Sequence, residues 1–169
     1  MIIRKMKKIL LIVFLMVATH CLAQQQLAFP FQGGKTAMTQ FFRDSLKVTP
    51  GIRLSKASGL VVFKFSADDQ GNLKNLVIYY ADDAILVSPV IEAMKKTNHK
   101  WIIPDKEKLH DFVIPFQFRF HTTNNGSKDD EAALLNFYVK HKPILSNDQI
   151  PLNLATLLPA ITVLYDNEQ

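Results

Sequence analysis

Alternating large apolar residues make the segment from Phe112 to Phe120 the strongest constraint on the fold of this chain. Phe or Ile stands at every second position there, and Val113, Pro115, Gln117 and Arg119 stand between them. A period of two places the large side chains on one face of an extended strand. Because Pro115 has no N–H to donate to a neighbouring strand, we expect this strand to have a free edge near that residue.

A second strand and a hairpin precede this segment. The residues from Gly59 to Ala67 show the same period of two, with their largest side chains at Phe63 and Phe65. Turn-forming residues from Asp68 to Asn72 separate them from a further apolar stretch, Lys74 to Tyr80. Two extended runs joined by a short Asp- and Gly-containing turn predict an antiparallel hairpin.

Two amphipathic segments predict helices that flank these strands. One runs from Lys35 to Leu46, and the other follows Asp82 and Asp83, which are typical helix-capping residues. Apolar residues recur at helical spacing in both segments: Met38, Phe41 and Phe42 in the first, and Val87, Val90, Ile91 and Met94 in the second. We therefore expect an α+β fold in which two helices cover one face of a small antiparallel three-stranded sheet. The residues expected to face the helices are Phe63, Phe65, Ile114 and Phe116.

The first 23 residues have the pattern of a secretory signal peptide. Four basic residues precede an apolar core from Ile9 to Ala18, and Cys21 and Ala23 supply small residues before a cut at Gln24. A retained anchor is one alternative, although this core is shorter than the roughly 20 residues that span a bilayer. Acylation of Cys21 is another, although His20 stands where a lipoprotein signal has a small residue. We expect export, to the periplasm or beyond, with cleavage before Gln24 and no stable membrane span afterwards.

Removal of this leader changes the charge of the chain. The full sequence has 20 Lys and Arg, 15 Asp and Glu and a net charge of +5. Four of the basic residues and none of the acidic ones lie in the leader, so the mature chain carries +1. This balance predicts no nucleic-acid partner. The only cysteine, Cys21, also lies in the leader, so the mature chain is predicted to have no disulfide.

Residues suited to catalysis or metal binding do not form a recognisable pattern. The mature histidines, His99, His110, His121 and His141, are too far apart in the sequence for one element to present two of them to zinc. A Gly-Gly pair precedes the first predicted helix, but it lacks the lysine and hydroxyl of a phosphate-binding loop. We predict no catalytic residue, no metal site and no cofactor, and we expect the single tryptophan, Trp101, to lie in the core.

The order of these elements resembles the C-terminal domain of TonB, the periplasmic protein that grips outer-membrane transporters. The resemblance rests on Phe31-Gln32-Gly33-Gly34 before the first helix, the hairpin, Trp101 and Pro104 after the second helix, and the strand that carries Ile114-Pro115-Phe116-Gln117-Phe118. Thr49 departs from the family pattern, because a tyrosine usually precedes the loop proline. Pro104 departs as well, because it comes three residues after Trp101 instead of two.

The resemblance implies a binding function based on strand pairing. In the TonB family an extended segment of the partner lies along the last strand of the domain, which here is Phe112 to Phe120. The partner-binding residues predicted on this strand are Val113, Pro115, Gln117 and Arg119. The partner would be a peptide or a protein, such as a TonB-dependent outer-membrane transporter. The alternative is a TonB-type component of transport that works with a separate membrane anchor, and an enzyme or a small-ligand carrier comes third.

Three parts of the chain follow from these patterns. Residues 1–23 are the predicted signal peptide, residues 24–121 the TonB-like domain, and residues 122–169 a polar linker with a partly apolar extension. Within the extension a short helix is expected after Ser127, and Ile161, Val163 and Tyr165 alternate as in a short strand. The stretch from Ala160 to Tyr165 loosely resembles the segment that TonB binds. We therefore hypothesise that this tail covers part of the sheet and must move, or choose another face, for a partner to pair along the strand from Phe112 to Phe120. The alternative is that the tail packs elsewhere through Leu134, Leu135 and Tyr138 and leaves the edge free.

Overall fold

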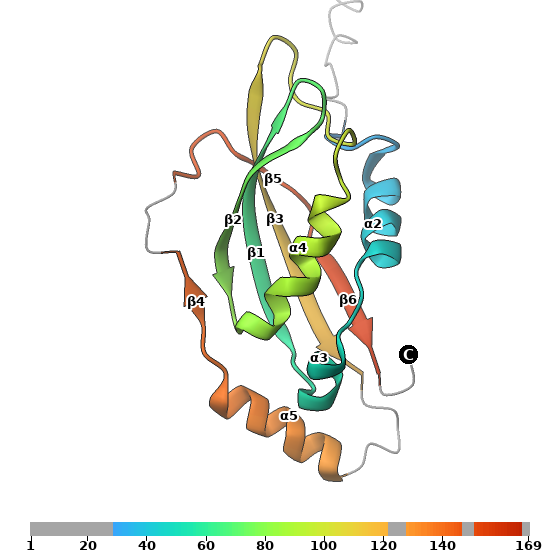
Figure 1. The fold of residues 1–169 in the computed structure, drawn as a ribbon, viewed down its shortest axis with the longest axis vertical. Helices are drawn as coiled ribbons and strands as arrows, with labels where there is room; N and C mark the ends of the chain where they lie inside the picture. The colour runs from blue at the N-terminus through green and yellow to red at the C-terminus, as the bar shows by residue number, and fades with distance from the viewer. Residues whose placement is uncertain (1–28, 122–127, 147–150, 167–169) are drawn as a thin grey trace, which may run out of the picture.

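The computed structural model describes residues 29–121, 128–146 and 151–166, so the predicted leader lies outside the described residues. In chain order the elements are α2 (Gly34–Ser45), α3 (Pro50–Ser55), β1 (Gly59–Asp68), β2 (Leu73–Ala81), the 3-10 helix η1 (Ala84–Leu86), α4 (Val87–Lys95), β3 (Leu109–Phe120), α5 (Lys128–Lys140), β4 (Ile144–Leu145), β5 (Thr156–Leu157) and β6 (Ile161–Tyr165). Helices α2 and α4 lie on one face of the sheet, and α3 and α5 lie near one end of it (Figure 1). The predicted α+β class is confirmed.

The three strands predicted from the period of two form the centre of the sheet. β1 pairs antiparallel with β2 on one side and with β3 on the other, with Phe63 opposite Ile114 and Phe65 opposite Phe112. The predicted hairpin turn is held by Asp68, whose carboxylate accepts from the backbone N–H of Asn72 at 2.7 Å. Gly71 has a φ of 78°, and a Cβ there would meet the backbone oxygen of Trp101 at 2.6 Å, so only glycine fits this turn.

The prediction of a three-stranded sheet is wrong, because the described part of the sheet has six strands in the order β4-β2-β1-β3-β5, with β6 also on β3. The three additional strands come from the C-terminal extension. β4 pairs with Tyr80 and Ala81 of β2, whereas β5 and β6 pair in parallel with β3. These strands are only two to five residues long, and prolines separate them in the sequence, so the local pattern alone did not identify them as a group.

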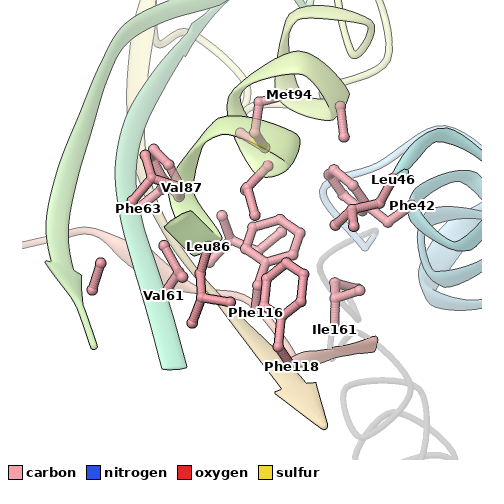
Figure 2. Close-up of a cluster of buried hydrophobic side chains, with 14 of the residues drawn as sticks. Phe42, Leu46, Val61, Phe63, Leu86, Val87, Met94, Phe116, Phe118 and Ile161 are labelled. Carbon is pink, nitrogen blue, oxygen red and sulfur yellow. The ribbon is translucent and has the colours of Figure 1, made fainter. Parts of the chain in front are cut away.

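The core lies between the sheet and the helices, as predicted. Phe63, Phe65, Ile114 and Phe116 are all fully buried. Phe42 of α2 meets Phe116 of β3 edge to face, with ring centroids 5.1 Å apart. Figure 2 shows this cluster, in which Leu86, Val87 and Met94 approach from η1 and α4. Ile161 of the C-terminal tail belongs to the same cluster, so the tail is part of the core.

The helix ends follow ordinary capping rules, with one helix that the sequence did not predict. Asp83 accepts from the N–H of Ile85 at 2.9 Å and so caps η1, which leads into α4. Thr49 caps α3 in the same way through the N–H of Ile52, in a segment expected to be a loop. The predicted position of Trp101 in the core is confirmed, since it is buried and its Nε1–H donates to Thr97 at 2.8 Å.

Helix α5 confirms the helix expected in the extension, although Ser127 lies outside the described residues. It packs against α3 through Phe137, which is its one buried residue, and through an ion pair of 3.2 Å between Asp130 and Lys56. Leu135 and Tyr138 remain exposed on its other side. Among the described residues, no helix has the length and apolar character needed to cross a membrane.

Candidate functional site

The predicted partner-binding residues all lie on β3, with their side chains on the face of the sheet away from α2 and α4. Val113 is buried, Pro115 and Gln117 are half-buried and Arg119 is exposed. The backbone oxygen of Val113 accepts from the N–H of Leu158, and the N–H of His121 donates to the oxygen of Tyr165, both at 2.8 Å. Alternate residues of a strand direct their backbone groups to the same side. Pro115, Gln117 and Arg119, which alternate between Val113 and His121, therefore also present their backbone groups to the tail. The four predicted residues therefore form the outer edge of β3.

This edge is occupied by the chain's own tail, so the expectation of a free edge is wrong in this conformation. Val113 lies opposite Leu157 of β5, and further along the strand Gln117 and Arg119 lie opposite Thr162 and Leu164 of β6. The hypothesis that the tail covers part of the sheet is confirmed, and the part it covers is the edge of β3. The alternation of Ile161, Val163 and Tyr165 was the sequence signal for this arrangement.

Pro115 coincides with a break in the tail ladder. Between the pairs Val113–Leu157 and Phe116–Ile161, β3 has two residues whereas the tail has three, Leu158, Pro159 and Ala160. The extra tail residue forms a bulge at the one position of the β3 edge that has no N–H. The missing donor therefore divides the tail into β5 and β6 but does not leave the edge free.

Tyr165 holds the end of β6 against the domain. Its side chain is 1% exposed, and its hydroxyl lies 2.7 Å from the backbone oxygen of Ala57 and 3.2 Å from that of Ile52. The ring also packs against Phe120, with centroids 5.6 Å apart. Burial raises the pKa of the Tyr165 hydroxyl, so it stays a neutral hydrogen-bond donor over the whole physiological range. Sequence reasoning did not identify this anchor, because its acceptors are main-chain carbonyls far away in the chain.

Polar contacts hold the other end of the tail, near β5. His110 lies between two oxygens, that of Glu107 at 2.7 Å from Nδ1 and that of Thr156 at 2.8 Å from Nε2. Lys64 donates to the backbone oxygen of Pro151 at 2.7 Å and pairs with Asp111, also at 2.7 Å. These contacts lie at the surface of the sheet, and Leu157 of β5 is 72% exposed. The two residues of β5 are thus held mainly by polar contacts, whereas Leu158 after β5 and both Ile161 and Tyr165 of β6 are buried.

Asp111 is the most strongly held carboxylate of this region. It accepts from the Ser66 hydroxyl at 2.6 Å in addition to its pair with Lys64. Burial raises the pKa of Asp111, but the hydrogen bonds from Lys64 and Ser66 outweigh this effect and hold it below the ordinary value. The carboxylate therefore stays ionised and keeps Lys64 in place beside the tail.

The opposite edge of the sheet is less suited to pairing with a partner. β4 pairs with Tyr80 and Ala81 at one end of β2, and the ladder between β1 and β2 is irregular at two places. Asn75 of β2 also has a left-handed backbone, with a φ of 47°. Irregular, bulged edges are a common way in which proteins prevent unwanted strand pairing. Of the two edges, that of β3 is the regular one.

Elsewhere a hollow of about 230 Å³ lies between α5, the end of α3 and the start of η1. It is lined by Asp83, Lys140 and His141 among others, and Asp83 is already committed to capping η1 and to the N–H of Lys142. In the described ranges no three His, Cys, Asp or Glu side chains are grouped as metal ligands would be. Of the four histidines named above, His99 lies beside the backbone oxygen of Gln70, and His141 lies beside that of Tyr138.

Comparisons of the chain with protein-family models, with curated proteins and with solved structures give no match.

Proposed function

We propose that this protein is an exported binding domain of the TonB C-terminal type that recognises a peptide or protein by strand pairing along the edge of β3. The observation that carries this proposal is the tail itself. β5 and β6 come from a distant part of the chain and pair in parallel with β3, β5 at Phe112 and Val113 and β6 from Phe116 to Phe120. The edge therefore accepts an extended, parallel segment, and a partner would bind by taking the place of the tail.

The energetics of this exchange depend on what the partner replaces. Each main-chain hydrogen bond contributes only about 0.5–1.5 kcal/mol net, and the partner would form the same bonds that the tail gives up. Removing the tail also exposes Leu158 and Ile161, which are each 2% exposed and worth about 1.5–3 kcal/mol when buried. In addition, the tail is tethered, and a tether gives an effective concentration on the order of millimolar. A partner must therefore supply comparable apolar side chains or be held nearby at high local concentration.

Two features support exchange that begins at β5. This end has only two ladder positions, Thr156 and Leu157, and the hydrogen bond from Lys64 to the backbone oxygen of Pro151 beside it is exposed. Local opening of weakly packed segments costs less free energy than global unfolding. A partner could pair first with Val113, next to β5, and then replace β6. A TonB-dependent outer-membrane transporter is the partner that the resemblance suggests.

A reversible lock between the tail and β3 tests the proposal. Gln117 and Thr162 are direct neighbours across β3 and β6, on the face away from the helices. Neighbouring strands lie about 4.8 Å apart, within the Cα range of a disulfide, so a Gln117→Cys/Thr162→Cys variant should form one. Envelope proteins retained by the immobilised mature domain should bind the reduced variant and be lost from the oxidised one. The single variant Gln117→Cys, treated with the same oxidant, is the control. Equal retention by both redox forms would refute strand exchange at β3.

A further inference from the structure

The way in which the tail is seated shows what the edge of β3 can accommodate. Three tail side chains point into the core and are almost completely buried: Leu158, Ile161 and Tyr165. Val163, between the last two, also packs against the core, whereas Thr162 and Leu164 face solvent. A segment that replaced the tail without filling these positions would leave cavities, and cavities in a core are costly. The domain therefore carries an internal copy of the side-chain pattern that its edge accepts.

Tyr165 adds a polar requirement to this pattern. The oxygen of Ile52 also accepts from the N–H of Ala57 at 3.1 Å, so it keeps a partner when Tyr165 leaves. The oxygen of Ala57 has the tyrosine hydroxyl as its close partner, at 2.7 Å. A buried carbonyl that loses its donor is destabilising. The position thus discriminates between tyrosine and phenylalanine, although the two rings have nearly the same shape.

The bulge at Pro115 sets the spacing of the pattern. In a regular strand, core-facing residues are two apart. In the tail, Leu158 and Ile161 are three apart, because Pro159 and Ala160 together pass the position of Pro115. Proline fits the tail bulge well, since it has no N–H that would need an acceptor. The direction of the bound segment is set as well, because both β5 and β6 run parallel to β3.

We infer that the β3 edge selects an extended segment that runs parallel to β3 and carries aliphatic residues at the positions of Leu158 and Ile161, a proline-containing bulge between them, and a tyrosine at the position of Tyr165. This inference rests on the proposed strand exchange and names the kind of segment that takes part in it. In one-letter code, the pattern from the first aliphatic position to the tyrosine is that of the tail, LPAITVLY. The tail then competes with the partner's segment for the β3 edge. Any change that weakens pairing of the tail with β3 should therefore increase the affinity for the partner's segment.

The test uses the mature protein and a synthetic peptide with the sequence of residues 155–166, labelled for fluorescence anisotropy. Three comparison peptides are needed: one with phenylalanine in place of tyrosine, one without the proline, and one with the same composition in scrambled order. The protein is compared with its Tyr165→Phe variant, in which only the hydroxyl of the resident tail is lost. The variant Leu164→Ala, which changes an exposed residue of the same strand, is the matched control.

We expect the peptide to bind the Tyr165→Phe variant about 5- to 150-fold more tightly than the unchanged protein, the factor that corresponds to a resident tail that leaves one buried acceptor without a donor. The phenylalanine peptide should bind more weakly by a similar factor, and the scrambled peptide should not bind. Leu164→Ala should leave the affinity within twofold. If all four peptides bind equally well, the inferred selectivity is refuted.

The redox lock separates failure of this inference from failure of the proposed function. Peptide binding that persists in the oxidised Gln117→Cys/Thr162→Cys protein would refute exchange at β3, and the inference with it. Binding that is lost on oxidation but does not distinguish the peptides would leave exchange intact and refute only the pattern. If the variant Tyr165→Phe folds poorly, Ile161→Val offers a milder way to weaken the tail. It should also raise the affinity of the peptide, and an unchanged affinity would refute competition by the tail.

Discussion

Replacement of Tyr165 by phenylalanine tests whether the tail is an integral part of the domain or a detachable cover. The change keeps the ring, which is buried and packs on Phe120, and removes only the hydroxyl. Of its two acceptors, the oxygen of Ile52 retains the N–H of Ala57, whereas that of Ala57 loses its close donor. Leaving one buried acceptor without a partner costs about 1–3 kcal/mol. The larger change Tyr165→Ala should cost about 3–5 kcal/mol, because it also creates a cavity.

Urea unfolding, followed by circular dichroism and by tryptophan fluorescence, measures this cost. Trp101 is distant from Tyr165 in the sequence and lies in the core, so it reports on the whole domain. We expect one transition for both signals, shifted to lower urea by the substitution. Leu164→Ala, on the solvent side of the same strand, should change the free energy of unfolding by no more than about 0.5 kcal/mol. An unchanged fluorescence transition, with loss of protection confined to residues 156–166 in amide exchange, would show that the tail unfolds independently.

The same hydroxyl predicts how stability depends on pH. Because the pKa of Tyr165 is raised in the folded state, its stabilising contribution is complete below the unfolded value of about 10 and is lost as pH rises towards the folded value. The unfolding free energy should therefore fall above about pH 10, and it should fall less in Tyr165→Phe. Identical alkaline profiles for the two proteins, measured by urea unfolding from pH 8 to 11, would contradict the buried hydrogen bond.

Three further results are expected. Phe116→Ala should destabilise the domain by about 3–5 kcal/mol, whereas Arg119→Ala should cost no more than about 0.5 kcal/mol, and equal losses in urea melts would show that the register of β3 is wrong. The pKa of Asp111 is lowered in the folded state, so its contribution is present above the unfolded value of about 3.9 and is lost as pH falls below it. Thermal melts from pH 6 to 3 should therefore show a smaller loss on acidification for Asp111→Asn, and parallel curves would contradict the pair with Lys64. Intact-mass measurement of the exported protein should show a chain that begins at Gln24, and a full-length species in the membrane fraction would contradict cleavage.

Local patterns in the sequence were sufficient for the central part of the fold. A period of two identifies β1 and β3 because each strand has one face against helices and the other outside the core, so apolar and other residues alternate. Helical spacing identifies α2 and α4 for the same reason. The buried positions of Phe63, Phe65, Ile114 and Phe116 follow directly from these periods. The residues of the β3 edge could likewise be named in advance, because the alternation that buries the phenylalanines also sets which backbone groups face outwards.

The occupant of that edge was decided by tertiary structure. β5 has two residues and β6 has five, which is too little for periodicity to establish more than a short strand-like piece. The bulge opposite Pro115 and the carbonyl acceptors of Tyr165 involve residues that are more than 40 and more than 100 positions apart in the chain, and no local pattern connects them. Such long-range contacts form only in the complete fold. An edge strand can pair with any extended segment that the folded chain brings beside it, so its neighbour is not set by its own local sequence. The sequence by itself thus determined the three central strands and the residues along the outer edge of β3, and the tertiary structure decided that the chain's own tail pairs with that edge.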